Sequence, residues 1–275
     1  MKTIARLPWA GRIGLASLVF WLLVALLGPL FAPHPTGAIV APDVFLGFTR
    51  EFPLGSDYLG RDMLSRMLLG ARYTVGLALA AALFASFAGT TLGVVASVSG
   101  RRLDEWLSRL LDALISIPSK IFALVLVAGF GASIPLLMLA AGITYLPGAF
   151  RISRSLAVNL NAMEFVAAAR ARGENRFYIA GVEILPNMWR PMLADFGLRF
   201  VFVVLLLSGL SFLGLGVQPP DADLGSLVRE NISGLAEGAP AIVMPAVAIA
   251  SLTIGVNLLI DCLPGRLEGD ERSGA

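Results

Sequence analysis

The stretch YTVGLALAAALFASFAGTTLGVVASV, from Tyr73 to Val98, contains no charged residue. A helix needs about 20 largely apolar residues to cross the hydrocarbon core of a bilayer, so this stretch predicts a membrane span. Five more stretches meet the same criterion, and we therefore expect an all-α, polytopic membrane protein with about six transmembrane helices. The six candidate spans are 13 to 31, 73 to 98, 109 to 130, 134 to 151, 191 to 215 and 241 to 263.

The composition agrees with lipid as the solvent of this chain. Of its 275 residues, 57% are hydrophobic and only 15% are charged, which is more apolar than a soluble fold of this size. The net charge is only +2, and no basic patch is interleaved with aromatic residues, which argues against a nucleic-acid partner. Cys262 and His34 are the only residues of their kinds, so an internal disulfide is excluded and a Cys/His metal site is not expected.

The first apolar segment, Ile13 to Phe31, follows Lys2, Arg6 and Arg12, as in a secretory signal peptide. It is long for the apolar part of such a peptide, and the prolines from Pro29 onward disrupt a small-residue cleavage site. We expect it to be an uncleaved first helix.

The distribution of Lys and Arg predicts the orientation, because cytoplasmic loops carry the excess of positive charge. With the N-terminus inside, 14 of the 21 Lys and Arg residues lie in cytoplasmic segments and 5 lie in external ones. We expect cytoplasmic tails at 1 to 12 and 264 to 275, and a membrane domain at 13 to 263. Within that domain, the segment 32 to 72 is expected outside and the loop 152 to 190 inside.

Three arginines oppose this charge rule because they crowd the expected external end of the second span: Arg61, Arg66 and Arg72. Asp57 and Asp62 lie beside them and could pair with them locally. The stretch Leu59 to Leu69 has apolar residues at helical spacing with charged residues between them. This pattern predicts a short amphipathic helix at the membrane surface.

The long loop contains EFVAAARARGENRFYIAGVEILPN, from Glu164 to Asn187. Its alanines favour a helix that another surface can approach closely, and Gly173 is placed to end that helix in a left-handed turn. A second short helix is expected from about Asn175, with Pro186 stopping it because proline lacks the amide donor. Three arginines surround the turn: Arg170, Arg172 and Arg176.

Polar residues inside the expected spans are few. Asp195 and Arg199 are four residues apart on one helix face, which predicts an internal ion pair. The only lysines, Lys2 and Lys120, do not belong to a GxxxxGK[ST] phosphate loop, so the chain supplies no ATPase site of that kind.

The loop resembles the EAA loop of ATP-binding-cassette (ABC) importer permeases. The shared pattern is a pair of alanines, a glycine four residues later, and Leu-Pro twelve and thirteen residues after the glycine. Two positions depart from it: Ala167 replaces the leading Glu, with Glu164 one turn earlier, and Glu183 stands at an Ile position. The resemblance implies a coupling helix that docks in a groove of the ATPase subunit, through Glu164, Ala167, Ala168, Ala169, Arg170, Arg172, Gly173, Leu185 and Pro186.

Two further stretches, FPLGSDYLGRDMLSRMLLGAR (52 to 72) and LSFLGLGVQPP (210 to 220), resemble signatures of the dipeptide/oligopeptide/nickel class of these permeases. Together with the loop, the resemblance covers roughly residues 50 to 261. Leu207 stands where many relatives have a Glu, and Pro264 and Gly265 interrupt the expected polar C-terminal helix.

The resemblance implies the architecture of a type I ABC importer permease in a bacterial inner membrane. The chain would be non-catalytic and without a cofactor, forming the pathway as a heterodimer with a homologous sister permease. Two cytoplasmic ATPase subunits would bind ATP and Mg, and an external solute-binding protein would deliver the solute. That solute would be a peptide, or a related nickel chelate or opine, with a sugar still open. The docking hypothesis for the binding protein rests on Asp57, Arg61, Asp62 and Gln218, with capping of helix ends as the alternative.

Two other classes of protein would fit an apolar helical chain. A secondary transporter predicts buried carboxylates near the midplane and broken helices. An intramembrane enzyme needs a nucleophile and base or metal ligands within the spans, and one His and one Cys supply little for either.

Overall fold

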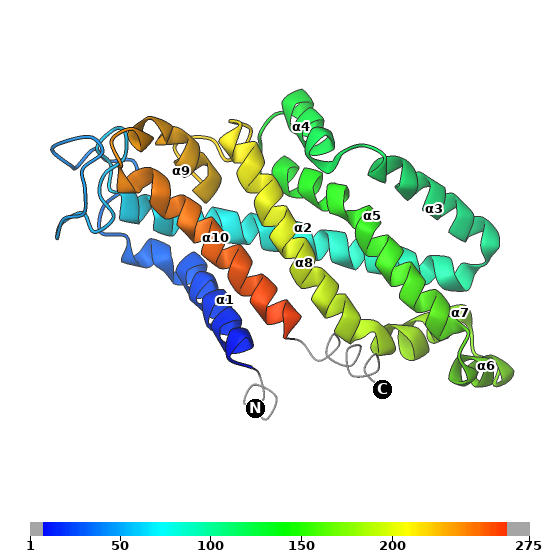
Figure 1. Ribbon diagram of the computed structural model, residues 1–275. Helices are drawn as coiled ribbons and strands as arrows, with labels where there is room; N and C mark the ends of the chain where they lie inside the picture. The colour runs from blue at the N-terminus through cyan, green and yellow to red at the C-terminus, as the bar shows by residue number, and fades with distance from the viewer. Residues whose placement is uncertain (1–7, 263–275) are drawn as a thin grey trace.

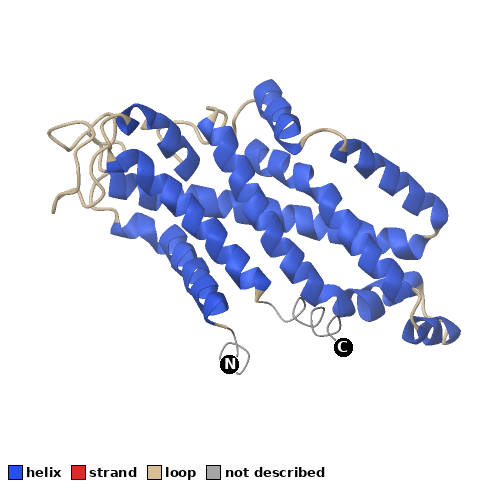
Figure 2. Cartoon of the chain, viewed as in Figure 1, coloured by secondary structure: helices blue, strands red, loops and turns tan. Residues whose placement is uncertain are grey.

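The computed structural model describes residues 8–262, and within this range every regular element is helical (Figures 1 and 2). The predicted all-α class is thereby confirmed. Residues 1–7 and the expected tail from 264, with Pro264 and Gly265, lie outside the described residues. In chain order the elements are α1 (Trp9–Leu27), η2 (Gly28–Phe31), α2 (Met63–Ser99), α3 (Arg101–Ile115), α4 (Ser119–Phe130), α5 (Ile134–Asn161), α6 (Glu164–Ala171), α7 (Arg176–Tyr178), η3 (Ile179–Ile184), α8 (Leu185–Phe212), α9 (Leu224–Glu230), η4 (Ile232–Leu235) and α10 (Pro240–Asp261).

Within the described range, five helical segments are long and apolar enough to cross a membrane, and the bent pair α3 and α4 raises this number to six when it is taken as one span. The expectation of about six spans is confirmed. The five are Trp9–Phe31, Met63–Ser99, Ile134–Asn161, Arg176–Phe212 and Pro240–Asp261.

The expected span at 109 to 130 is not one continuous helix. The chain bends by 82° between α3 and α4. Pro118 precedes α4 and has no amide to continue the hydrogen bonds of α3, and its ring disfavours a helical conformation at Ile117. The number of apolar residues predicted the length of this stretch correctly, but it gave no sign of the break between α3 and α4.

The predicted surface helix at 59 to 69 is also wrong, because α2 runs without interruption from Met63 to Ser99. Asp62 caps the helix by accepting hydrogen bonds from the backbone amides of Leu64 and Ser65. Met63 and Met67 are buried in the protein core rather than facing lipid. The amphipathic pattern is real, but its apolar side packs against the rest of the chain.

Pro186 does not stop a helix, contrary to the prediction. A stretch of wider π-helix, η3, precedes it, and the amide of Leu185 bonds to the carbonyl of Ala180, five residues back. The wider turn makes room for the proline ring in the first turn of α8. The side-chain amide of Asn187 donates to the carbonyl of Glu183 at 2.7 Å. Helix therefore continues from α7 into α8.

Close helix packing at small residues builds the core. The most extensive pairing is that of α2 with α5, where Gly89 and Gly93 bring the two backbones together. In Figure 1, α6, the start of α1 and the end of α10 lie toward one end of the bundle. The long segment before α2 and the helix α9 lie at the other end.

Candidate functional site

The α6 loop, residues 162 to 175, projects from the end of α5 (Figure 1). One side of α6 is anchored, because Val166 and Ala169 are fully buried. They belong to a small apolar cluster with residues of α2, α5, η3 and α8. Ala169, one of the two motif alanines, is therefore a packing residue of the loop itself.

The opposite side of α6 is exposed and almost flat. Glu164, Ala167, Ala168 and Ala171 occupy positions i, i+3, i+4 and i+7, so they share one face, and all four are exposed. Three of them have no side chain beyond Cβ. A second protein can therefore bring its backbone close to the three alanines of this face without displacing a long side chain.

Gly173 ends α6 as predicted. Its φ of 84° lies in the left-handed region, which favours glycine. The amide of Gly173 bonds to the carbonyl of Arg170, and the amide of Glu174 bonds to that of Ala169. These two bonds form a Schellman motif, which fixes where the helix ends and how the chain leaves it.

Three arginines in and directly after the loop bond it to neighbouring elements. Arg170 donates to the side-chain oxygen of Asn161 at the end of α5, at 2.6 Å, and Arg176 donates to the carbonyl of Ser99 at the end of α2, at 3.1 Å. Arg172 pairs with Glu183 at 3.3 Å. Glu183, the departure from the motif, thus has a partner inside the same loop region.

Leu185 and Pro186 do not lie on α6. Both are exposed, at the junction of η3 and α8. Pro186 occupies the first turn of α8, where its missing amide is tolerated. These two motif residues therefore mark how the loop rejoins the bundle.

The other end of the bundle contains a four-residue ion cluster, Asp57, Arg61, Arg66 and Glu230. Asp57 is fully buried and accepts from Arg61 and from Arg66, each at 2.6 Å. Glu230 of α9 pairs with both arginines, at 3.0 and 2.8 Å. Burial lowers the pKa of Arg61, but attraction to Asp57 and Glu230 outweighs burial and raises it. Two of the arginines that opposed the charge rule are thereby neutralised.

The residues of the docking hypothesis lie at this end, but most are enclosed. Asp57 and Asp62 are buried, so neither presents a surface to another protein. Asp62 caps α2, and Asp57 also accepts the backbone amides of Leu59 and Arg61. Gln218 is exposed, and its amide donates to the carbonyls of Gly214 and Gly216. The geometry favours the capping alternative for Asp62, whereas Asp57 belongs to the ion cluster.

Asp223 is a buried acid that the sequence reasoning did not single out. It caps α9 by accepting from the amide of Ser226 at 2.9 Å, and it accepts from the hydroxyl of Ser211 at 2.5 Å. Burial raises the pKa of its carboxyl, against the opposing effect of these hydrogen bonds and one from Val217. The capping box of Asp223 with Ser226 was a readable signal in the sequence.

Replacing Asp223 by alanine is expected to lower the free energy of unfolding by about 2 to 4 kcal/mol, because a cap is lost and buried donors lose their acceptor. The thermal unfolding midpoint in detergent measures this. Asp43→Ala is the matched control, since Asp43 is exposed. Equal midpoints for the two variants would contradict the structural role of Asp223.

Comparison with known proteins supplies a family for this arrangement. Residues 89–269 match the family described as binding-protein-dependent transport system inner membrane component. The chain is 30% identical to a dipeptide transport system permease protein of Alkalihalophilus pseudofirmus, over 95% of this chain and 86% of that protein. It is 29% identical to a di/tripeptide transport system permease protein of Pseudomonas aeruginosa, over 95% and 89%. It is also 31% identical to a glutathione transport system permease protein of Pectobacterium atrosepticum, over 78% and 71%.

Proposed function

This chain belongs to the family of binding-protein-dependent transport system inner membrane components, and from that premise we propose that it carries peptides across the membrane while a separate ATPase docks on α6. As a family member it is a multi-pass inner membrane protein and a non-catalytic permease subunit of an ABC importer. Peptide is the favoured solute because dipeptide, di/tripeptide and glutathione permeases are all similar to most of the chain.

The observation that carries the docking proposal is the division of α6 into two faces. Val166 and Ala169 secure the helix from inside, and the small outward face is free for a partner. A short helix with such a face fits a groove, because its three alanines allow close approach. The Schellman turn and the bonds of Arg170 and Arg176 connect the loop to the ends of α5 and α2, and we propose that a displacement of the ATPase passes along these connections.

The proposed orientation places α6 and both ends of the described chain in the cytoplasm. These elements share one end of the bundle (Figure 1), and the excess of Lys and Arg in segments at that end supports it. The ion cluster and α9 then face outward. There we propose that exposed groups such as Gln218, rather than the buried Asp57 and Asp62, meet the solute-binding protein.

One feature of the structure was expected for the rival class of secondary transporters, namely a broken helix, which α3 and α4 form. Asp195 does not supply the free buried carboxylate that the same class predicts, because Arg199 neutralises it at 2.6 and 2.8 Å. This pair is the one that the sequence predicted. Family membership decides in favour of the ABC importer.

The docking proposal predicts that Ala168→Arg lowers peptide uptake about tenfold or more, since a long charged side chain on the flat face blocks a groove and loses at least 1.4 kcal/mol of binding. Uptake of labelled dipeptide is measured in vesicles that contain the sister permease, the ATPases and the binding protein. Copurification of the ATPase reports docking separately.

The matched control is Ala236→Arg, which places the same side chain at an exposed position at the opposite end of the bundle. It is expected to leave ATPase binding unchanged. Ala169 is unsuitable for this test because it is buried, and a substitution there disturbs the loop itself. Normal copurification and uptake with Ala168→Arg would refute docking through this face. Uptake of a nickel chelate or an opine, but of no peptide, would refute the proposed solute.

A further inference from the structure

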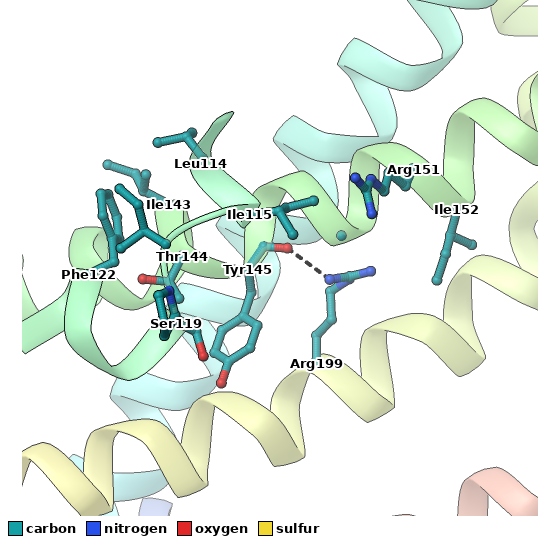
Figure 3. A pocket seen from close by; sticks show the side chains of 13 residues that line it. Leu114, Ile115, Ser119, Phe122, Ile143, Thr144, Tyr145, Arg151, Ile152 and Arg199 are labelled. Carbon is teal, nitrogen blue, oxygen red and sulfur yellow. Dashed lines mark hydrogen bonds between the residues drawn. The ribbon is translucent and has the colours of Figure 1, made fainter. Parts of the chain in front are cut away.

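A pocket of about 490 Å³ lies where α3 bends into α4, bounded on its other sides by α5 and α8 (Figure 3). Its polar lining consists of Ser119, Thr144, Tyr145, Arg151 and Arg199. The rest of the lining is mostly isoleucine, leucine and phenylalanine. The 82° break at Pro118 creates this space, because a straight helix over these residues would continue past α5.

The pocket lies at the middle of the membrane-spanning helices. Gly148 is near the centre of α5, and Arg199 is near the centre of α8. A charged side chain at this depth is costly, and such residues usually mark the path of a solute or an ion. The pocket is therefore a candidate for part of the pathway rather than a packing defect.

Arg199 is held in place but keeps hydrogen-bonding capacity. Its Nε and Nη2 donate to Asp195, and its Nη1 donates to the carbonyl of Tyr145 at 2.8 Å (Figure 3). Each terminal nitrogen carries two hydrogens, so each keeps one N–H beyond these bonds. Gly148 makes the approach possible, because a Cβ there would lie 2.8 Å from Nη1.

A second arginine faces the same space. Arg151 pairs with Asp112 of α3 at 2.6 Å, and the side chains of both are more than half exposed in this chain, at 55% and 52%. It lies one turn along α5 from Gly148. An exposed ion pair is suited to contact with water or with another protein rather than with lipid. This side of α3 and α5 therefore suits a pathway or a contact with the sister permease better than it suits lipid.

One residue of the lining has a backbone carbonyl without its usual helical donor. Pro147 has no amide, so the carbonyl of Ile143, four residues earlier, lacks its usual helical donor. Ile143 lines the pocket. The arginines supply donors at this site, and each arginine charge is balanced by its own aspartate.

We infer that this pocket contacts the solute during passage, and that Arg199 and Arg151 bind the carboxylate of a peptide there. The inference rests on the proposed function and adds a site and a chemical class to it. Guanidinium groups suit carboxylates because they donate two parallel N–H bonds. Among the residues that the structure describes, the lining has no carboxylate, imidazole or thiol, so it offers no ligand of these kinds for a bare nickel ion. Charge balance keeps the binding weak enough for release.

The test uses cysteine labelling of the assembled importer in detergent, without the binding protein, so that the result reports the permease alone. Cys262 is the only native cysteine, and Cys262→Ser supplies the background. Thr144→Cys and Ile152→Cys place thiols in the pocket lining, and Leu23→Cys places one on an exposed position of α1 as the control. An anionic methanethiosulfonate reagent is expected to label the two pocket thiols and not the control.

Dialanine at millimolar concentration is expected to slow labelling of the pocket thiols about tenfold, and its C-terminal amide much less, because the amide lacks the charge that guanidinium groups bind. The double variant Asp195→Leu with Arg199→Met removes the pair without leaving an unpaired charge. In this double variant the pocket thiols are expected to remain labelled. Dialanine is expected to protect them no better than its amide does.

The outcomes separate the two proposals. The inference would be overturned if the pocket thiols stayed unlabelled, or if dialanine and its amide protected them equally. Dialanine uptake by the complete importer would in that case still support the proposed function. Absence of any peptide uptake by the wild-type importer would overturn both.

Discussion

Replacing Asp57 by leucine is expected to lower the free energy of unfolding by about 3 to 5 kcal/mol, as for other buried ion pairs that lose one partner. Asp57 accepts four hydrogen bonds, two from backbone amides and two from arginine side chains. Its loss leaves the buried Arg66, together with Arg61, to share the single carboxylate of Glu230. The thermal midpoint of the purified protein in detergent measures this effect.

The control is the double variant Asp57→Leu with Arg66→Met, which restores charge balance by leaving Arg61 with Glu230. Because the two residues are in direct contact, their effects are expected to be less than additive by about 0.5 to 3 kcal/mol. Strict additivity would show that Asp57 and Arg66 do not act as a pair.

Replacing Gly93 by leucine is expected to lower the free energy of unfolding by about 3 kcal/mol or more, at the upper end of the range for overpacked cores. A Cβ at this position would lie 2.8 Å from the backbone nitrogen of Arg154 and 2.9 Å from the carbonyl oxygen of Phe150. Backbone atoms cannot rotate away, so α2 and α5 must separate. The yield of monodisperse protein after extraction and its thermal midpoint measure this.

Gly76→Leu is the matched control, because Gly76 lies on the same helix with nothing within 4 Å of an added Cβ. It introduces the same side chain and the same change in helix propensity. A similar loss of yield in both variants would show that leucine in α2, rather than the crossing with α5, causes the defect.

Local sequence rules predicted the α6 loop well. The alanine run favours helix, and Gly173 supplies the left-handed residue of a Schellman turn, both of which depend on neighbours within a few residues. The same rules failed at Pro186, because the π-helical widening of η3 lets the proline sit inside a continuing helix. They also gave no sign that Ala169 faces inward while Ala168 faces outward.

The end of the bundle around α9 was much less predictable. Local charge suggested pairing of Asp57 with nearby arginines, which is confirmed, but Glu230 joins them from 169 residues beyond Arg61. Asp62 was grouped with Asp57 and instead caps α2. A local stretch of sequence does not show which distant helix will pack over it. The capping and docking roles of Asp57 and Asp62 could therefore not be distinguished from the sequence.

The sequence by itself determined the membrane class, the number of spans, the charge asymmetry and the turn of the α6 loop, because each depends on apolar length, charge counts or local propensity. Only the tertiary structure decided which face of α6 is free, which acids are buried in the ion cluster, and how the break at Pro118 opens a pocket beside Arg199. The physical reason is that burial and ion pairing depend on contacts between helices far apart in the chain. Those contacts form where helices cross closely, as α2 and α5 do at Gly93. No local sequence pattern shows where such a crossing will be.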